Sequence, residues 1–518
     1  MSDTTGVHEP WPPPHPVIDA AYGPRFRPPV PPPVPEPGGR RAGWDLTPIE
    51  PTPRSSRWLV VFTAICVLFA ALGGYLAYRF VSNDQNPTSW DPRVSNLAVF
   101  VERETGLSFT RPVRVRFLND AEFDKLVTDE ASSLSDGERR KIADDEAIGR
   151  AFGWYTGTTD VVEQKNQLNS AGVLALYSFA SREIVVRTDE PNAATFSVAI
   201  RATITHEMVH VIQDQHLDVR KLQSNAKGEE QARSVTALIE GHAVYVERRY
   251  IFSLPEAEQQ AFFDYANKAG DEVDAATKDV APAITTGLEA PYLTGPILVA
   301  AAALTKAGIE QLFVRPPLAL DQVLDPRAYF FEDIPETVDA PTEPGSGVEK
   351  GTIGMVRLYL TLATARSPQE AWEAATGWGN DSYTAARADE KSPVCVSWNL
   401  VADSEAAAKT LHSALSKWVT TRVKQSAVTV DPSTSPIKVR FCDPGTAVAQ
   451  TLVAETAVDY FYTRANVLEA LIENSGSLDV ATCATDVVMR TETVANLQEP
   501  DDALRSRVAA AVSACSKS

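Results

Sequence analysis

The chain has 518 residues, of which 44% are hydrophobic and 22% charged, and it contains 36 prolines and 27 glycines. This length and composition suit two or three domains with a sizeable core, and they exclude a wholly disordered chain, a collagen and a multi-span transporter. The formal net charge of −20 argues against a nucleic-acid partner, because an acidic surface repels phosphate backbones.

The N-terminal segment 1–57 is rich in proline and holds 16 of the 36 prolines. Proline removes a backbone donor and restricts φ, so this stretch favours extended polyproline II structure over a packed core. We predict a disordered, cytoplasmic tail that serves as a solvated spacer. The alternative is a docking segment for a cytoplasmic partner with an SH3-like or WW-like groove.

The next segment, Trp58–Tyr78, carries no charge and is long enough to cross a bilayer. It has an aromatic residue at each end, and arginines are more frequent before it than after it. These features predict a transmembrane helix over 58–80, a cytoplasmic N-terminus and an extracytoplasmic region over 81–518 at the cell membrane. A cleaved signal peptide is not expected, because the apolar run starts late and no A-x-A site follows it.

Beyond this segment, apolar spacing predicts short strands and helices, followed by a mostly helical stretch from Phe196 to about Ala269. The expected early elements are a helix over 94–104, a strand Val113–Phe117, a helix over 120–127, and a hairpin of Val173–Phe179 and Glu183–Arg187. The strand Glu183–Arg187 is expected at the edge of its sheet, where an extended peptide can pair with it as an added strand.

The chemistry-bearing motif is H-E-x-x-H, formed by His206, Glu207 and His210. On a helix, positions i and i+4 lie on one face, so the two imidazoles can bind one zinc ion while Glu207 acts on a water molecule beside it. The surrounding residues 203–212 contain no proline, glycine or second charge. An isolated buried carboxylate is costly, which favours a metal site over a chance pair of histidines.

A catalytic zinc needs a third protein ligand, and two residues compete for this role. Glu240 is a lone carboxylate in a second apolar helix and is followed by Gly241, which permits close helix approach. His216 gives a spacing that resembles the metzincin pattern, but Gln213 stands where metzincins have a glycine that ends the helix. If the helix continues, His216 points about 240° away from His210. We favour Glu240 and keep His216 as the alternative metal ligand.

Three further residues are candidates for supporting the ligands or stabilising a transition state. Asp214 lies one turn beyond His210 and could accept a hydrogen bond from a ligand histidine. His242 follows Glu240 closely, and the Tyr292 hydroxyl could donate to a developing oxyanion. For His242 and Tyr292, packing in the core is the competing interpretation.

The C-terminal part, 390–518, is predicted to be a smaller α+β region that carries four of the five cysteines. Strand-like runs Val394–Val401 and Ile437–Cys442 surround a helix near 404–422. Four exported cysteines without a metal-binding spacing indicate two disulfides. We favour Cys395–Cys442 and Cys483–Cys515, because each pair joins neighbouring segments, and we expect Cys66 to be free.

Several segments resemble an uncharacterised family of exported or membrane-anchored bacterial HExxH proteins with gluzincin-like features. The matching segments, which span roughly 170–420, are HEMVHVIQDQH (206–216), ALIEGHAVYVE (237–247), APYLTG (290–295), RPPLALDQVLDPRAY (315–329), ATGWGNDSY (375–383) and VSWNLVADSEAAAKTL (396–411). The resemblance implies His206, His210 and Glu240 as zinc ligands and Glu207 as the general base. One departure is His242, where an acidic residue is expected.

The expected fold is therefore α+β and mainly helical: a zincin-like metallopeptidase domain over 81–389 that follows a single transmembrane helix, and a C-terminal α+β region over 390–518. The expected function is a membrane-anchored, extracytoplasmic peptidase with one Zn²⁺ per chain that acts on a peptide or protein in the cell envelope. The alternative is a catalytically inactive zincin-fold scaffold that binds a cell-envelope partner.

Overall fold

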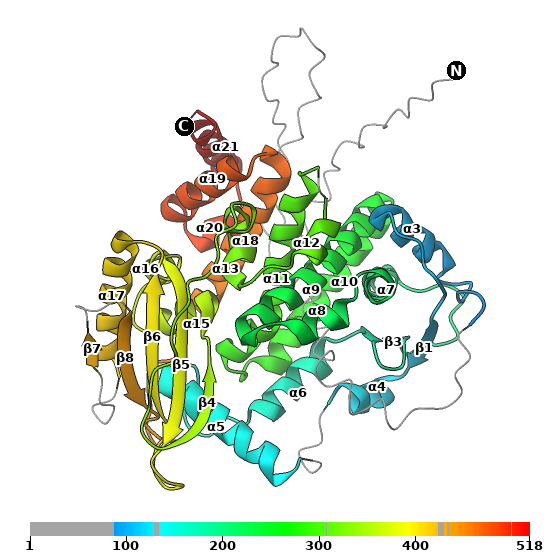
Figure 1. Cartoon of the computed structure of the whole chain (residues 1–518). Coiled ribbons are helices and arrows are strands. Elements are labelled where there is room, and N and C mark those ends of the chain that lie inside the picture. Colours follow the sequence, from blue (N-terminus) through cyan, green and yellow to red (C-terminus); the bar gives the residue numbers. More distant parts are fainter. Residues whose placement is uncertain are drawn as a thin grey trace.

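The structure, a computed structural model, describes residues 87–128, 134–306, 308–422, 429–431, 436–498 and 500–517 (Figure 1). The predicted proline-rich tail, the predicted transmembrane helix and Cys66 lie outside these ranges. Helices dominate the described residues and are accompanied by two sheets. The expected fold class included a transmembrane helix; against that expectation, no helix within these ranges combines the length and apolar character needed to span a bilayer.

The first part of the described chain, up to residue 187, forms four helices and a three-stranded sheet. These elements are α3 (Ser95–Thr105), β1 (Arg114–Leu118), α4 (Asp120–Val127), α5 (Asp136–Phe152), α6 (Val161–Gly172), β2 (Ala175–Ser178) and β3 (Glu183–Arg187). The strand order is β1-β3-β2, with β1 parallel and β2 antiparallel to β3. The expectation that Glu183–Arg187 forms an edge strand is therefore wrong, because β3 is paired on both sides and β2 is an outer strand.

A group of long helices forms the centre of the molecule (Figure 1). The helices from this part of the chain are α7 (Val198–His216), α8 (Val219–Asn225), α9 (Gly228–Ser253), α10 (Glu256–Thr277), α11 (Pro282–Ala303) and the short α12 (Glu310–Val314), α13 (Leu320–Leu324) and α14 (Pro326–Phe330). Helix α9 packs against α7 and α11. The middle of α7 is buried on all sides, which agrees with its nearly uninterrupted apolar sequence.

The second sheet has five antiparallel strands in the order β4-β5-β6-β8-β7. Its strands and helices are β4 (Ser346–Gly351), α15 (Gly354–Ala363), α16 (Pro368–Ala375), β5 (Trp378–Arg387), β6 (Cys395–Ala402), α17 (Glu405–Thr420), β7 (Thr429–Asp431) and β8 (Ile437–Cys442). The domain boundary predicted between 389 and 390 falls in the connection between β5 and β6. These strands pair from Trp378–Ala402 to Ala386–Cys395, so one sheet crosses this boundary.

The chain ends in four helices, α18 (Glu455–Ser475), α19 (Leu478–Thr491), α20 (Val494–Gln498) and α21 (Asp502–Cys515). Helix α18 packs against α11, so the predicted region 390–518 adds strands to the sheet and helices to the helical centre. Both predicted disulfides are confirmed. Cys395–Cys442 joins β6 to β8, and Cys483–Cys515 joins α19 to α21.

Candidate metal centre

Helix α7 carries His206, Glu207 and His210 in its buried middle. The helix begins after Ser197, whose hydroxyl accepts a hydrogen bond from the backbone N–H of Ile200. From there the helix continues through the whole motif, so the two histidines stand one turn apart on the same face.

Helix α9 supplies the carboxylate opposite this face, because its rotation is set by a close contact with α11. A Cβ atom added to Gly241 would lie 2.2 Å from the carbonyl carbon of Gly295, so the two backbones touch at these glycines. Consecutive residues of a helix point about 100° apart. With Gly241 against α11, the preceding residue Glu240 faces α7.

The three side chains converge on one point. Nε2 of His206 and Nε2 of His210 each lie 3.4 Å from Oε2 of Glu240. All three ligand atoms lie within 4.8 Å of one another, and the residues that carry them are buried. Among the described residues, these three side chains are the cluster of histidine, cysteine or acidic residues that could hold a metal ion.

The geometry of the cluster fits a zinc ion. Ligand atoms about 2.1 Å from a tetrahedral zinc ion are separated from one another by about 3.4 Å, the distance found between each histidine nitrogen and Glu240. In addition, Nε2 of both histidines and both Glu240 oxygens have no hydrogen-bond partner among the described residues. Buried polar atoms without hydrogen bonds lower the stability of the folded state, and a metal ion would satisfy them.

The electrostatics of the cluster favour positive charge between the histidines and the carboxylate. Burial lowers the pKa of His206, but Glu240 and Glu247 outweigh this effect and raise its pKa to about 10. Burial also opposes the charged form of His210, whose pKa is nevertheless raised by Glu240. The pKa of Glu240 is lowered, because the two histidines outweigh the effect of burial.

Two residues that the sequence analysis missed support the histidines. Nδ1 of His206 lies 3.1 Å from Oε2 of Glu247, and Nδ1 of His210 lies 2.8 Å from Oε1 of Gln213. Such contacts fix the orientation of a ligand imidazole and leave Nε2 facing the metal position. Helical spacing could have indicated both residues, because Gln213 is one turn beyond His210 and Glu247 is two turns beyond Glu240.

The Glu207 carboxylate lies fully buried beside this cluster. Neither of its oxygens has a hydrogen-bond partner among the described residues. Burial raises the pKa of Glu207, while the nearby histidines His210 and His206 act in the opposite direction. A buried, unpaired carboxylate next to a candidate metal position has the environment of a general base.

Two sequence candidates lie outside the cluster. Asp214 does not hydrogen-bond to a ligand histidine: it accepts a hydrogen bond from the Tyr177 hydroxyl at 2.9 Å and another from Arg220 at 3.1 Å. His216 is the last residue of α7 and is exposed, with Nε2 2.7 Å from the carbonyl oxygen of Ser108. The helix does not turn back before His216, so this side chain is directed away from the cluster.

The other two candidates lie close to the cluster. The Tyr292 ring is nearly parallel to that of His206, with centroids 6.3 Å apart and an interplanar angle of 24°. The Nδ1 atom of His242 is 3.3 Å from Nε2 of Gln213, the residue whose Oε1 faces His210. Burial and, to a smaller extent, the charge of His210 lower the pKa of His242 to about 4, so it is neutral at pH 7.

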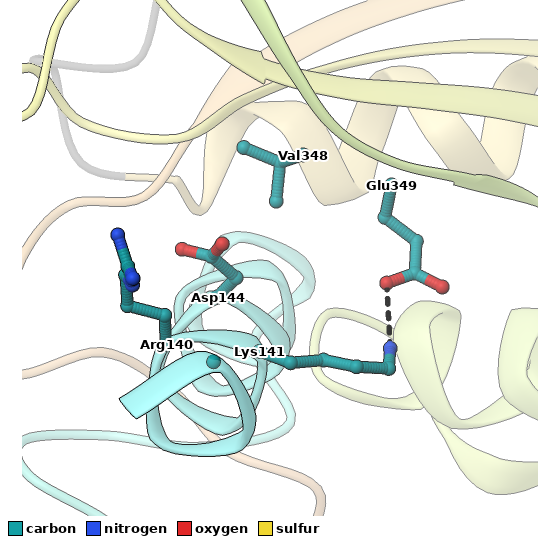
Figure 2. Close-up of a pocket in the computed structure, with 6 residues that line it drawn as sticks. Arg140, Lys141, Asp144, Val348 and Glu349 are labelled. Atoms are coloured by element: carbon teal, nitrogen blue, oxygen red, sulfur yellow. Dashed lines mark hydrogen bonds and ion pairs between the residues drawn. The ribbon is translucent and has the colours of Figure 1, made fainter. Parts of the chain in front are cut away.

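A separate surface groove of about 430 Å³ lies between α5 and β4 (Figure 2). Its lining residues are Gly137, Arg140, Lys141, Asp144, Val348 and Glu349, none of which belongs to the histidine cluster. Figure 2 shows Lys141 reaching across to Glu349, with Nζ 3.0 Å from Oε2. The groove is lined by both positive and negative side chains, and part of their charge is satisfied internally.

Comparison with known proteins gives one match, which lies outside the candidate metal centre. Residues 341–458 match the model of a domain of unknown function, DUF8575. This range covers the five-stranded sheet and excludes α7, α9 and α11. No curated protein and no solved structure matches the chain significantly.

Proposed function

We propose that the chain is a zinc-dependent hydrolase that cleaves peptide bonds. The observation that carries this proposal is the convergence of His206, His210 and Glu240, whose ligand atoms lack hydrogen bonds, beside the unpaired carboxylate of Glu207. Two imidazoles and one carboxylate are a zinc ligand set that leaves a fourth position open for water or substrate.

The reaction assigns one chemical role to Glu207. When bound, zinc supplies a Lewis acid that polarises a carbonyl group and lowers the pKa of water. Glu207 takes the proton of the attacking water and transfers it to the leaving amine. Burial raises the pKa of Glu207, and a raised pKa strengthens a carboxylate as a proton acceptor.

The substrate is proposed to be an extended peptide. Strand β2 is an outer strand of the three-stranded sheet and contacts α7. A peptide that pairs with β2 would run past α7, where the candidate metal centre lies. The two disulfides support an oxidising compartment outside the cytoplasm, and hence a protein or peptide of the cell envelope as substrate.

The test combines zinc content with cleavage. We expect one zinc per chain by mass spectrometry of the metal, and cleavage of unfolded casein by the purified full chain. Glu207→Gln should keep the zinc and lose cleavage by at least about 100-fold, because it removes a base and no ligand. Cleavage at the unaltered rate by this variant would exclude Glu207 as the base.

A second candidate function is a scaffold that uses a zinc ion for stability. It is favoured by the burial of the site, since His206 and His210 are 1% exposed and Glu207 and Glu240 are 0% exposed. In this case, zinc removal should lower the unfolding midpoint of the chain, and no cleavage should appear with any unfolded substrate. Peptide cleavage that follows zinc content would exclude the scaffold.

A further inference from the structure

We propose that Gln213 and His242 are positioning residues, which together hold His210 in the tautomer that presents Nε2 to the metal. This inference rests on the metal centre of the proposed function, but it concerns side chains beyond the three candidate ligands. The contacts form a relay that runs from His242 to Gln213 and from there to His210.

The orientation of the Gln213 amide is set by a backbone carbonyl. Nε2 of Gln213 donates to the carbonyl oxygen of Ile239 at 2.8 Å, and a carbonyl oxygen can only accept. The other end of the amide, Oε1, therefore faces Nδ1 of His210 at 2.8 Å. Because Oε1 is an acceptor, Nδ1 of His210 carries hydrogen, and its Nε2 is left with a free lone pair.

His242 completes the relay by occupying the second hydrogen of the Gln213 amide. Its Nδ1 lies 3.3 Å from Nε2 of Gln213, and its ring lies against Phe313, with centroids 5.5 Å apart. Gln213 is 0% exposed and His242 is 4% exposed, so water does not replace these contacts. With both amide hydrogens engaged, the Gln213 side chain cannot flip and present a donor to His210.

The relay is also connected to the segment of α9 that carries Glu240. The carbonyl of Ile239 belongs to the residue before Glu240, so Gln213 connects the backbone of α9 to the His210 imidazole of α7. The same amide thus sets the tautomer of one ligand and ties it to the chain segment that carries another. Glu247 performs the corresponding contact for His206, but its carboxylate has no N–H with which to form such a link.

The test measures zinc affinity of the full chain by competition with a chelator. Gln213→Met keeps the length of the side chain and removes both acceptor and donor, and we expect a loss of about 10–100-fold in zinc affinity. Gln213→Glu keeps an acceptor for His210 and should recover most of this affinity. Gln215→Met is the matched control on the same helix, because the Gln215 amide contacts Thr110 and Arg111 instead of the cluster.

A double-mutant cycle distinguishes positioning from general destabilisation. We expect His242→Leu alone to weaken zinc binding by less than about tenfold, and to cause no further loss when Gln213 is already methionine. The unfolding midpoints of the metal-free variants show whether folding has changed. In the zinc-loaded chain, nitrogen NMR of labelled histidine should show hydrogen on Nδ1 of His210, and Gln213→Met should broaden or shift this signal.

Three results would overturn the relay. The first is unchanged zinc affinity in Gln213→Met while Glu240→Ala loses zinc, which would leave the metal centre intact and remove the role of Gln213. The second is equal loss in Gln213→Met and Gln213→Glu, which would exclude control of the tautomer by an acceptor. The third is full additivity of the Gln213 and His242 substitutions. If the unaltered chain binds no zinc, both the relay and the metal centre are wrong.

Discussion

Two fully buried carboxylates, Glu240 in α9 and Asp381 in β5, differ in the hydrogen-bond donors around them. Asp381 is surrounded by hydrogen-bond donors. Its oxygens accept from the backbone N–H groups of Ile353 and Gly354 at 2.8 and 2.9 Å and from the indole N–H groups of Trp378 and Trp398, both at 2.8 Å. Four donors can hold a carboxylate in the core without a counter-ion, so Asp381 is explained by the fold itself.

Glu240 has no comparable set of donors. Its oxygens lack hydrogen bonds among the described residues, and the imidazole nitrogens of two histidines lie 3.4 Å from Oε2. The fold therefore surrounds Asp381 with donors, whereas Glu240 faces only the imidazoles of His206 and His210 in the described pairs. The comparison teaches that burial alone does not indicate a functional carboxylate; the informative feature is burial without donors.

The largest expected effect comes from removing this carboxylate. Glu240→Ala takes away a candidate ligand, and we expect zinc affinity to fall by more than about 100-fold, beyond the loss usual for a supporting residue. Chelator competition measures the effect. His216→Ala is the control, because His216 is exposed and contacts Ser108. If His216→Ala loses zinc and Glu240→Ala keeps it, the assignment of the third ligand is wrong.

The second prediction concerns the contact that directs Glu240 toward α7. In Gly295→Ala, the new Cβ would lie 1.9 Å from the carbonyl oxygen of Ala237 and 2.7 Å from Cα of Gly241. Both are backbone atoms that cannot move aside cheaply, so we expect a loss of about 3 kcal/mol in the free energy of unfolding and weaker zinc binding. Urea unfolding measures the stability.

A matched control for this substitution lies on the same helix. Gly287 is exposed in α11, and a Cβ added there meets no atom within 4 Å. Gly287→Ala should therefore stabilise the helix by about 0.5–1 kcal/mol. If Gly295→Ala and Gly287→Ala behave alike, α9 and α11 are not in backbone contact.

The third prediction tests the other side of the comparison. Asp381→Asn replaces one acceptor oxygen by an N–H₂ group that would face N–H donors, and we expect a loss of about 2 kcal/mol in stability. Zinc affinity should stay within about twofold of the unaltered chain, because additivity holds for sites without shared partners. Asp389→Asn, in the exposed turn after β5, is the control and should change stability by less than about 0.5 kcal/mol.

Periodicity within a single helix or strand was the most reliable guide to this structure. The predicted helix over 120–127 and the predicted strand Ile437–Cys442 have the observed bounds. The histidine pair could be located because both residues lie within one helix, and Glu240 could be proposed because it is a lone carboxylate next to a glycine. All of these inferences use local spacing.

Features that depend on long-range pairing could not be inferred in the same way. The parallel pairing of β1 with β3 places β3 in the middle of its sheet, and it joins residues such as Val115 and Ile184 that are distant in the sequence. The roles of Gln213 and Glu247 depend on how α9 is rotated against α7. Strand β4 was missed because SGVEKG has no apolar alternation.

The resemblance motifs ATGWGNDSY and VSWNL are accounted for in part by the second sheet. They supply Asp381 itself and its two indole donors, Trp378 and Trp398. These residues lie within the range matched by the domain of unknown function. These residues therefore stabilise the second sheet and carry no information about zinc. The resemblance thus has two separate parts, one in the sheet and one in the helices around the HExxH motif.

The smallest expected effect concerns Asp321, whose surroundings are intermediate between those of Asp381 and those of Glu240. It is half-buried, and its Oδ1 has no hydrogen-bond partner among the described residues. Burial, with smaller contributions from Glu230, Asp403 and Asp333, raises its pKa from 3.8 to about 7. The folded state then binds a proton that the unfolded state has released, so this carboxyl destabilises the fold increasingly as the pH rises from about 4 to 7.

Asp321→Asn removes the titration and should therefore become more stable than the unaltered chain at high pH. We expect a gain of about 1 kcal/mol at pH 8 that shrinks toward zero near pH 4, less than the full pKa shift implies, because water reaches the side chain and screens its charge. Urea unfolding at several pH values gives the difference. Asp279→Asn, at an exposed position, should show no such trend. If the Asp321→Asn difference does not change with pH, the carboxyl is ionised in the folded state at little cost, and an oxygen without a visible donor is then no evidence for a missing cation.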